Sequence, residues 1–188
     1  MDNRLSSWTA GLAALLCASA LAAGAEEHAS RSAKSDPQSF VQNAAQDGML
    51  EVELGKIAQQ KSQDPQVQKF GARMVKDHGK ANAELASIAK QQNLEVPTQL
   101  DRKHQKMVQE MRDKSGTEFD LAYAEHMAKD HSKAVDLFKE ASRSDDPQIA
   151  GFAKKTLPTL EEHKSMADSM VTETRTAAAK DSETPARR

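Results

Sequence analysis

Met127-Ala-Lys-Asp-His-Ser-Lys-Ala134 is the stretch that decides the fold, because the chain repeats it almost unchanged at Met74-Val-Lys-Asp-His-Gly-Lys-Ala81. Both stretches read Met-x-Lys-Asp-His-x-Lys-Ala, and both lie in the middle of a long segment with helical spacing of its apolar residues. A repeated unit indicates a fold built from similar supersecondary elements. We therefore expect two similar helices, each carrying an adjacent Asp and His.

Turn signals on either side of the two repeats divide the chain into five predicted helices. Their expected ranges are 39–62, 65–92, 100–115, 117–143 and 146–171. Asp-Pro pairs mark two of the starts, since Asp caps a helix and Pro is tolerated in its first turn. We expect Ser39 to cap the first helix, and Thr117 with Asp120 to form a capping box for the fourth. Pro158 should kink the fifth helix or delay its regular part.

The pairing of these helices predicts the fold class. No strand pattern occurs, so the chain should be all-α. The first two long helices form one hairpin and the last two form another, with the shorter third helix connecting them. This is the plan of a ferritin-like four-helix bundle. The predicted helical domain covers residues 38–171, between a flexible leader at 26–37 and a polar, patternless tail at 172–188 that we expect to be disordered.

Residues 1–25 have the features of a cleaved export signal. Arg4 precedes an apolar run from Leu12 to Leu21, and Ala23-Gly24-Ala25 supplies a small-x-small cleavage site. An uncleaved anchor is the alternative. No later segment approaches the roughly 20 apolar residues of a membrane span. We predict a protein of the periplasm or cell envelope. Its mature chain would have no disulfide, because the only cysteine is Cys17.

Charge and motif content exclude several functions. The chain has 26 basic and 28 acidic residues, interleaved along its length, which argues against nucleic-acid binding. It has no nucleophile motif, phosphate-binding loop or glycine-rich fingerprint. The sequence therefore assigns no catalytic residue and no organic cofactor, and it favours a binding role over an enzymatic one.

One ionisable side chain on each long helix faces the apolar stripe of that helix on a helical wheel. These side chains are Glu51, His78, Asp130 and His163. Within each hairpin the two residues lie about equally far from the turn, so they should share one level of the bundle. Burial of a lone charge costs several kcal/mol, so we expect these groups to be paired or to bind a metal ion.

Three further residues complete the predicted metal site. His126, His131 and Asp77 lie close to the same stripes and could add ligands or orient the ligands. Mixed imidazole and carboxylate donors suit iron, manganese or zinc. Copper is the alternative, because methionines lie four residues before two of the histidines and three after His163.

A metal-free reading explains the same residues. The polar groups could satisfy one another as Glu–His and Asp–His pairs, and the methionines could be core fillers. Arg73 and Lys80 lie at helical spacing from Asp77 and could form a surface ion pair with it. The Glu-x-x-His motif of diiron bundles is absent from the sequence, which counts against oxidase chemistry.

Five short motifs together resemble the bacterial family of domain of unknown function 4142, over about residues 38–171. They are Phe40-Val41, Met74-x-x-Asp77-His78, Ser115-Gly116-x-x-Phe119-Asp120, Asp130-His131 and Leu157-Pro158-x-Leu160-x-x-His163. The resemblance implies an exported, ferritin-like bundle of the envelope with no agreed activity. It also makes His78, His131, His163, Asp77 and Asp130 the positions of interest.

The functional expectation is an exported envelope bundle that binds a metal ion at mid-height and acts in envelope stress protection. The alternative is a non-enzymatic structural or interaction protein of the envelope with a metal-free polar core. The sequence leaves the oligomeric state and any protein partner open.

Overall fold

The computed structural model describes residues 36–183, with side chains as far as Lys180. The predicted export signal and almost all of the predicted leader lie outside these residues. The described part holds five helices and no strand: α2 (Pro37–Lys61), α3 (Pro65–Gln91), α4 (Arg102–Asp113), α5 (Gly116–Ala141) and α6 (Pro147–Glu183). The predicted all-α class is confirmed. None of these described helices combines the length and the apolarity needed to cross a membrane.

Aspartates placed directly before a proline begin three of the helices. Asp36 caps α2 by accepting from the Ser39 backbone N–H at 3.0 Å, so the prediction that Ser39 is the cap is wrong. Asp64 accepts from the N–H of Gln66 at 2.7 Å at the start of α3. Asp146 does the same for the first turn of α6. Each carboxylate satisfies N–H groups that have no partner within the helix.

The start of α5 differs from the prediction. The helix begins at Gly116, where φ is +57°, and Ser115 makes no capping bond with its side chain. Thr117 therefore lies inside the helix and forms no capping box. Asp120 is buried, and burial raises its pKa despite an interaction with Ser62. Because the Asp120 side chain lies on the inner face of α5, it does not reach back to cap the start of the helix.

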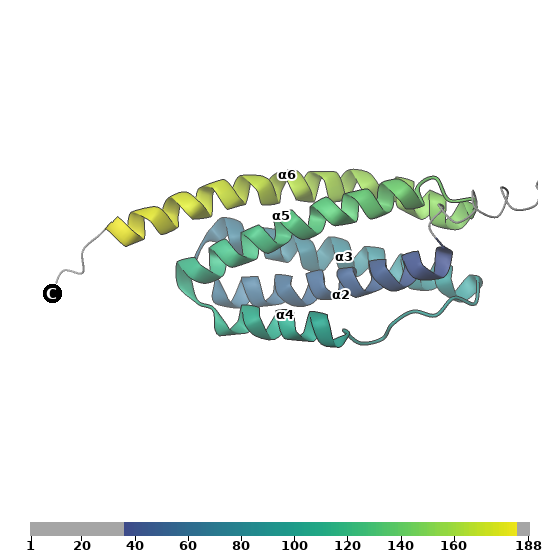
Figure 1. Ribbon diagram of the computed structural model, residues 1–188, viewed down its shortest axis with the longest axis horizontal. Helices are drawn as coiled ribbons and strands as arrows, with labels where there is room; N and C mark the ends of the chain where they lie inside the picture. The colour runs from purple at the N-terminus through teal and green to yellow at the C-terminus, as the bar shows by residue number, and fades with distance from the viewer. Residues whose placement is uncertain (1–35, 184–188) are drawn as a thin grey trace, which may run out of the picture. The chain divides into compact units, whose positions relative to one another are not determined.

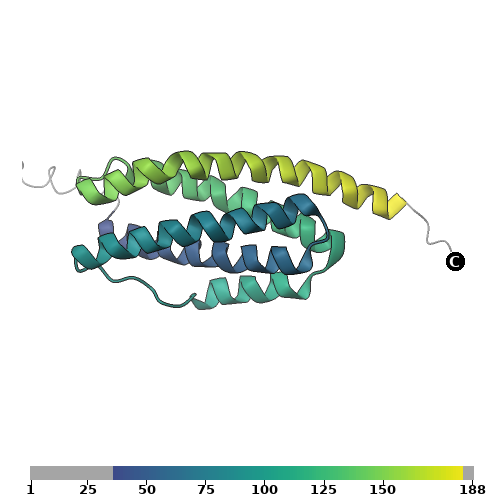
Figure 2. The same cartoon turned by 180° about the vertical axis from the view of Figure 1, so that it is seen from behind.

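The five helices form two antiparallel hairpins with a connecting helix, as the sequence predicts. α2 lies against α3 and α5 lies against α6, while α4 packs mainly on α2 (Figure 1). After α3 the chain returns along the bundle and passes through α4 before α5 begins, and the view from behind shows the same two pairs (Figure 2). The hairpin of α2 and α3 is tight. A Cβ on Gly55 would lie 2.6 Å from the Gly71 carbonyl oxygen, so only glycine fits there.

The core consists of two apolar clusters at different heights in the bundle. One includes Leu54, Phe70 and Tyr123, and the other includes Phe40 and Phe138. A set of buried ionisable side chains lies between them: Glu51, His78, His131 and His163. The apolar core is therefore interrupted at mid-height by polar groups from all four long helices.

Helix α6 is longer than predicted. It passes through Pro158 without a break and continues to Glu183, so the prediction of disorder is wrong for residues 172–183. Thr174 is buried and donates its hydroxyl to the Met170 carbonyl at 2.8 Å, and Arg175 forms an ion pair with Glu125 of α5 at 2.7 Å. The alanines at 177–179 favour helix. Contacts to α5 therefore extend the helix beyond the last large apolar residue.

Candidate metal site

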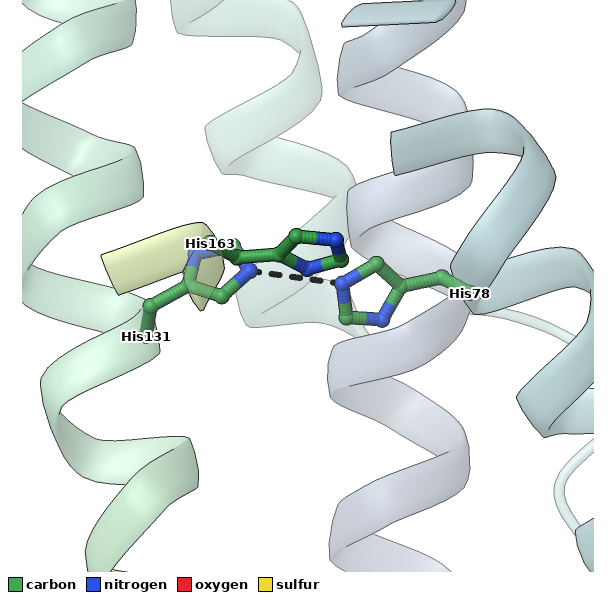
Figure 3. A group of neighbouring side chains, drawn as sticks. All are labelled: His78, His131 and His163. Atoms are coloured by element: carbon green, nitrogen blue, oxygen red, sulfur yellow. Dashed lines mark hydrogen bonds between the residues drawn. The ribbon is translucent and has the colours of Figure 1, made fainter. Parts of the chain in front are cut away.

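Three imidazole rings from three helices meet in the centre of the bundle. They belong to His78 on α3, His131 on α5 and His163 on α6, and one nitrogen of each lies within 4.8 Å of the other two (Figure 3). The three residues, named the histidine triad below, are 9%, 1% and 1% exposed. The Nε2 atoms of His78 and His131 are 3.3 Å apart. The internal repeat thus brings its two histidines into contact.

The backbone of α5 fixes the tautomer of His131. Its Nδ1 lies 2.9 Å from the carbonyl oxygen of Met127. A carbonyl oxygen only accepts, so Nδ1 must carry the proton and donate. In the neutral ring, Nε2 then has a lone pair, and this lone pair points toward His78. Nε2 is therefore the only nitrogen of His131 that can act as a metal ligand.

Asp77 fixes His163 in a similar way from a neighbouring helix. Nε2 of His163 lies 3.0 Å from Asp77 Oδ2, and its N–H donates a hydrogen bond to this carboxylate oxygen. Nδ1 of His163 is buried and has no hydrogen-bond partner among residues 36–183. Figure 3 shows a nitrogen of this ring facing the gap between the other two rings. The bare nitrogen of His163 therefore belongs to the same cluster as the two Nε2 atoms.

Burial keeps the three histidines neutral. It lowers the pKa of His78 well below the usual range, and the rings of His131 and His163 add to this effect. Burial lowers the pKa of His131 to about 4. It also lowers the pKa of His163, although the hydrogen bond to Asp77 acts in the opposite direction. Neutral imidazole is the form that binds metal ions, so near pH 7 no proton has to leave these rings.

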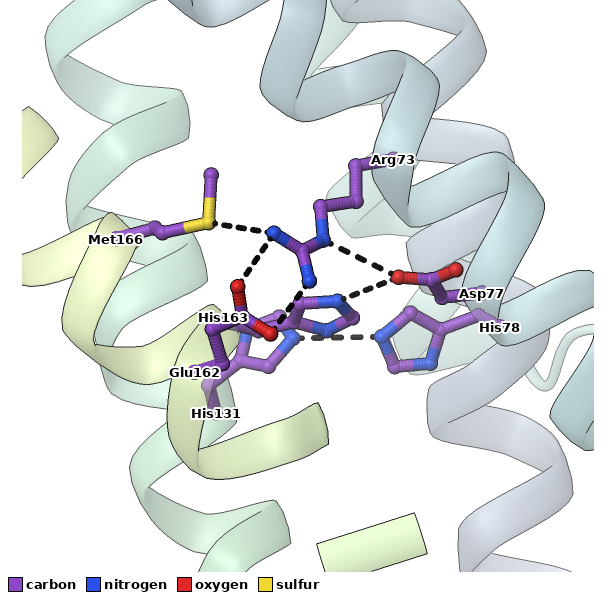
Figure 4. A network of polar contacts seen from close by, with 7 residues as sticks. All are labelled: Arg73, Asp77, His78, His131, Glu162, His163 and Met166. Carbon is purple, nitrogen blue, oxygen red and sulfur yellow. Dashed lines mark hydrogen bonds and ion pairs between the residues drawn. The ribbon is translucent and has the colours of Figure 1, made fainter. Parts of the chain in front are cut away.

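Arg73 holds Asp77 in position at the surface (Figure 4). Its Nε lies 3.2 Å from Asp77 Oδ2, while its two terminal nitrogens bind the Glu162 carboxylate at 2.8 and 2.6 Å. Burial acts to raise the pKa of Asp77, but the bonds from His163 and Arg73 outweigh it and lower that pKa. Asp77 therefore stays ionised and orients His163, while Arg73 with Glu162 joins α3 to α6.

Glu51 lies beside the triad from the fourth long helix. It is 3% exposed, and its Oε1 is 4.0 Å from Nδ1 of His131. Its Oε2 is buried without a hydrogen-bond partner in the described part of the chain. Burial raises the pKa of Glu51 well above its usual range, and the charges of Asp130 and Asp47 raise it further. Glu51 is thus a neighbour of the histidine cluster and is not one of its three members.

Asp130 and His126 do not reach the triad. Asp130 lies at the side of α5, 3.6 Å from Nε2 of His126 and 3.3 Å from Nζ of Lys133. The sequence predicted that Asp130 faces the apolar stripe of this helix and that His131 lies only close to it, and the structure reverses this order. The missed signal was a set of large apolar residues at spacings of four and seven from His131: Met127, Val135 and Phe138, all buried.

The triad can be tested as a metal site on its own geometry. Metal–nitrogen bonds of about 2.0–2.1 Å in tetrahedral coordination separate two ligand nitrogens by about 3.3 Å. The His78 and His131 nitrogens are 3.3 Å apart. Each of His131 and His163 has an acceptor on its far nitrogen, as ligating histidines usually do. The unpartnered nitrogen of His163 supplies the third donor. The residues present therefore fit one ion held by three imidazoles.

Comparisons with known proteins bear on the family and the fold. The model of the family described as Domain of unknown function (DUF4142) matches residues 22–170. Among solved structures, CopM in the Cu(II)-bound form is similar, with a TM-score of 0.63 and 15% sequence identity, over 74% of this chain and 98% of that chain. At this identity the likeness concerns the fold alone. A search of curated proteins finds no significant match.

Proposed function

We propose that this chain, which belongs to the DUF4142 family, binds a single transition-metal ion through His78, His131 and His163. The ion would lie between the two apolar clusters, out of reach of bulk water. Glu51 would stand beside it without being a primary ligand. Asp77 and the Met127 carbonyl would keep the rings of His163 and His131 in their ligating tautomers.

The bare Nδ1 of His163 is the observation that carries this proposal. A buried polar atom without a partner costs about 1–3 kcal/mol, so proteins rarely leave one unsatisfied. Here that atom faces two other ring nitrogens, and no donor within residues 36–183 bonds to it. A metal ion would satisfy all three nitrogens at once. A purely structural cluster would leave His163 unsatisfied.

The donor set points to copper or zinc. Imidazole suits copper, zinc, iron and nickel, whereas manganese prefers carboxylate and water oxygens. No carboxylate belongs to the histidine group, which counts against manganese, one of the three metals that the sequence favoured. The Irving–Williams order makes Cu(II) the tightest divalent ion for a nitrogen site. That CopM, with a similar fold, was solved with Cu(II) makes copper the first ion to test.

We further propose that the chain acts as a metal-binding protein of the periplasm or cell envelope. The export signal predicted at residues 1–25 supports this location. A buried site with three protein ligands holds an ion away from peroxide and other reactants. A protective role in the envelope follows from such sequestration, and no reaction has to be catalysed.

Thermal denaturation with added metal tests the proposal. A ligand that binds only the folded state raises the midpoint, by about 2.7 kcal/mol of stability at 100 times the dissociation constant. Cu(II) and Zn(II) should raise the midpoint of the native chain and leave His163→Ala almost unchanged. Lys164→Ala is the matched control, because Lys164 is the next residue and its side chain pairs only with Asp168 among the ion pairs of residues 36–183. Equal shifts in the native chain and in His163→Ala would contradict the proposal.

A metal-free core is the competing reading, and one contact favours it. His78 Nε2 can donate to His131 Nε2 across 3.3 Å, which satisfies both atoms without an ion. The bundle would then be a structural or interaction protein of the envelope. In that case His78→Ala would lower the midpoint by the same amount with or without metal, and no ion would shift the native chain.

A further inference from the structure

Two hollows lie on either side of the line along which α3 packs against α6. The inner cavity, of about 30 Å³, is lined by residues of the four long helices, and His78 is one of them. The outer hollow, of about 130 Å³, opens at the surface and is lined by residues of α3 and α6. Ala81 and Thr156 line both spaces. These two side chains therefore form the wall between the surface and the cavity at His78.

This wall is thin and lies close to the histidine triad. Its two side chains are small, and both are partly exposed. Ala81 follows His78 by one helical turn, and Thr156 precedes His163 by two turns, so each shares a helix face with a histidine of the triad. His78 is 9% exposed, whereas the other two histidines are 1% exposed. The residual exposure of the triad is thus concentrated at the residue that lines the inner cavity.

The backbone of α6 is weakened at the same place. Pro158 has no N–H, so the Lys154 carbonyl lacks the helical hydrogen bond that residue 158 would otherwise donate. Lys155 and Thr156 lie in the turn that this bond would close. The helix passes through the proline without a break, but a turn with a missing bond opens more easily than its neighbours. The Thr156 side of the wall can therefore move while the bundle stays folded.

An ion pair joins the two sides of the outer hollow. Nζ of Lys155 on α6 donates to both carboxylate oxygens of Glu84 on α3, at 2.8 Å each. The Lys155 side chain is 62% exposed, and a surface pair of this kind contributes at most about 1 kcal/mol. The pair therefore breaks readily. Glu84 then presents a free carboxylate in the hollow, which attracts a cation.

We propose that the seam between α3 and α6 is the route by which a metal ion reaches the histidine triad. The Lys155–Glu84 pair is its lid, and Ala81 with Thr156 is its narrowest point. This route rests on the proposed function, since it supplies the ion that the triad binds. The ion displaces Lys155 from Glu84, passes the wall when the proline turn opens, and meets His78 first. The seam thus sets how fast the triad fills and empties, and leaves its affinity unchanged.

Stopped-flow measurement of Zn(II) exchange between the whole chain and a chromophoric indicator tests the route. Ala81→Leu should slow association and dissociation alike by about tenfold, or about 1.4 kcal/mol in each barrier, because the larger side chain blocks the wall. The dissociation constant should therefore stay the same. Lys155→Ala should speed association by about threefold, because the lid is gone and Glu84 is free. Lys164→Ala removes the same charge from α6 at the pair with Asp168, and it should leave the rates unchanged.

Ala134→Leu is the matched control for Ala81→Leu. Ala134 holds the place of Ala81 in the second repeat, and it lines the same inner cavity from α5, which takes no part in the seam. Both substitutions add the same side chain beside the cavity, and only Ala81→Leu narrows the seam. Equal slowing in both variants would overturn the route and would favour an entrance beside Asp47, which also lines the cavity. Circular dichroism checks that each variant folds, and if Ala81→Leu does not, equal rates in Lys155→Ala and Lys164→Ala would overturn the route.

Chemical labelling without metal separates the route from the proposed function. Diethyl pyrocarbonate modifies neutral imidazole, and peptide mass spectrometry gives the rate of modification at His78 in the metal-free chain. Ala81→Leu should slow this modification, Lys155→Ala should speed it, and Ala134→Leu should leave it unchanged. A native chain that shows this pattern but binds no Zn(II) would overturn the metal site and support the seam as the way into the cluster. Equal rates at His78 in all these chains would overturn the route, whether or not Zn(II) binds.

Discussion

Asp77 and His163 are joined across α3 and α6 by a contact of 3.0 Å between a carboxylate oxygen and Nε2 of the ring. The contact determines which nitrogen of His163 is bare, and that nitrogen is the one facing His78 and His131. The same Asp77 oxygen accepts from Arg73 at 3.2 Å. The orientation of a buried ring thus depends on an ion pair at the surface.

Asp77→Ala should weaken metal binding about 10- to 100-fold, because it removes the acceptor that orients His163. Competition titration with a chromophoric chelator measures the affinity. Glu162→Gln is the matched control, since Glu162 binds Arg73 but does not contact His163 by any bond in the described chain. If the two variants lose affinity equally, the surface ion pair matters and the bond to His163 does not.

Acid should destabilise the metal-free protein through His131. Its pKa in the folded state is about 4, below the usual value of 6.5. Between these two pH values the unfolded chain therefore binds more protons than the folded chain. The stability that neutral His131 contributes is fully present above pH 6.5 and is lost as the pH falls toward 4. The loss amounts to about 3 kcal/mol for this one residue. Urea denaturation from pH 7.5 to 4 measures it.

Glu51 should act in the opposite direction. Its pKa in the folded state is raised, so its contribution is present below the usual value of 4.5 and is lost as pH rises through the raised value. In Glu51→Gln the stability should therefore fall more steeply on acidification than in the native chain. His131→Gln should make the curve flatter. A native curve that is level across this range, with both variants parallel to it, would show that neither group is buried as the structure has it.

Gly55→Ala should destabilise the bundle by about 1–3 kcal/mol, because the added methyl group meets the Gly71 carbonyl oxygen at 2.6 Å. Gly151→Ala is the control on α6. Nothing lies within 4 Å of its added methyl group, so the change should stabilise the helix by about 0.5–1 kcal/mol. Denaturation by urea measures both. Equal effects of the two substitutions would mean that α2 and α3 are not in close contact at Gly55.

Amide hydrogen exchange tests the extension of α6. Residues 172–176 should exchange more slowly than an unstructured chain, because Thr174 is buried and Arg175 forms an ion pair with Glu125 of α5. Arg175→Ala should speed exchange in this segment while leaving the residues around Leu160 unchanged. Exchange at the unstructured rate in the native chain would return these residues to the disordered tail that the sequence suggested.

Local sequence rules were sufficient for most of the fold. Asp64 and Asp146 before proline gave the correct starts of α3 and α6, and the apolar stripes of three helices pointed Glu51, His78 and His163 inward. Each of these inferences depends on neighbours within one or two turns. The pairing of the hairpins followed from the order of the helices along the chain, with the shorter third helix as the connection between the two pairs.

The errors arose where tertiary contacts decide. On α5, Met127 and Val135 are buried on the same face as His131, and a helical wheel drawn without these two residues points Asp130 inward instead of His131. At the end of α6 the helix depends on contact with Glu125, about 50 residues earlier in the chain. The bond between Asp77 and His163 joins residues 86 positions apart. No spacing rule within one helix could have assigned that partner.

The most direct test of the triad is the nitrogen count around bound Cu(II). One equivalent of Cu(II) should be added to the metal-free chain, and the electron paramagnetic resonance spectrum recorded. We expect coupling to three imidazole nitrogens, reduced to two by His163→Gln. A spectrum of Cu(II) among oxygen donors that His163→Gln leaves unchanged would contradict a metal site at His78, His131 and His163.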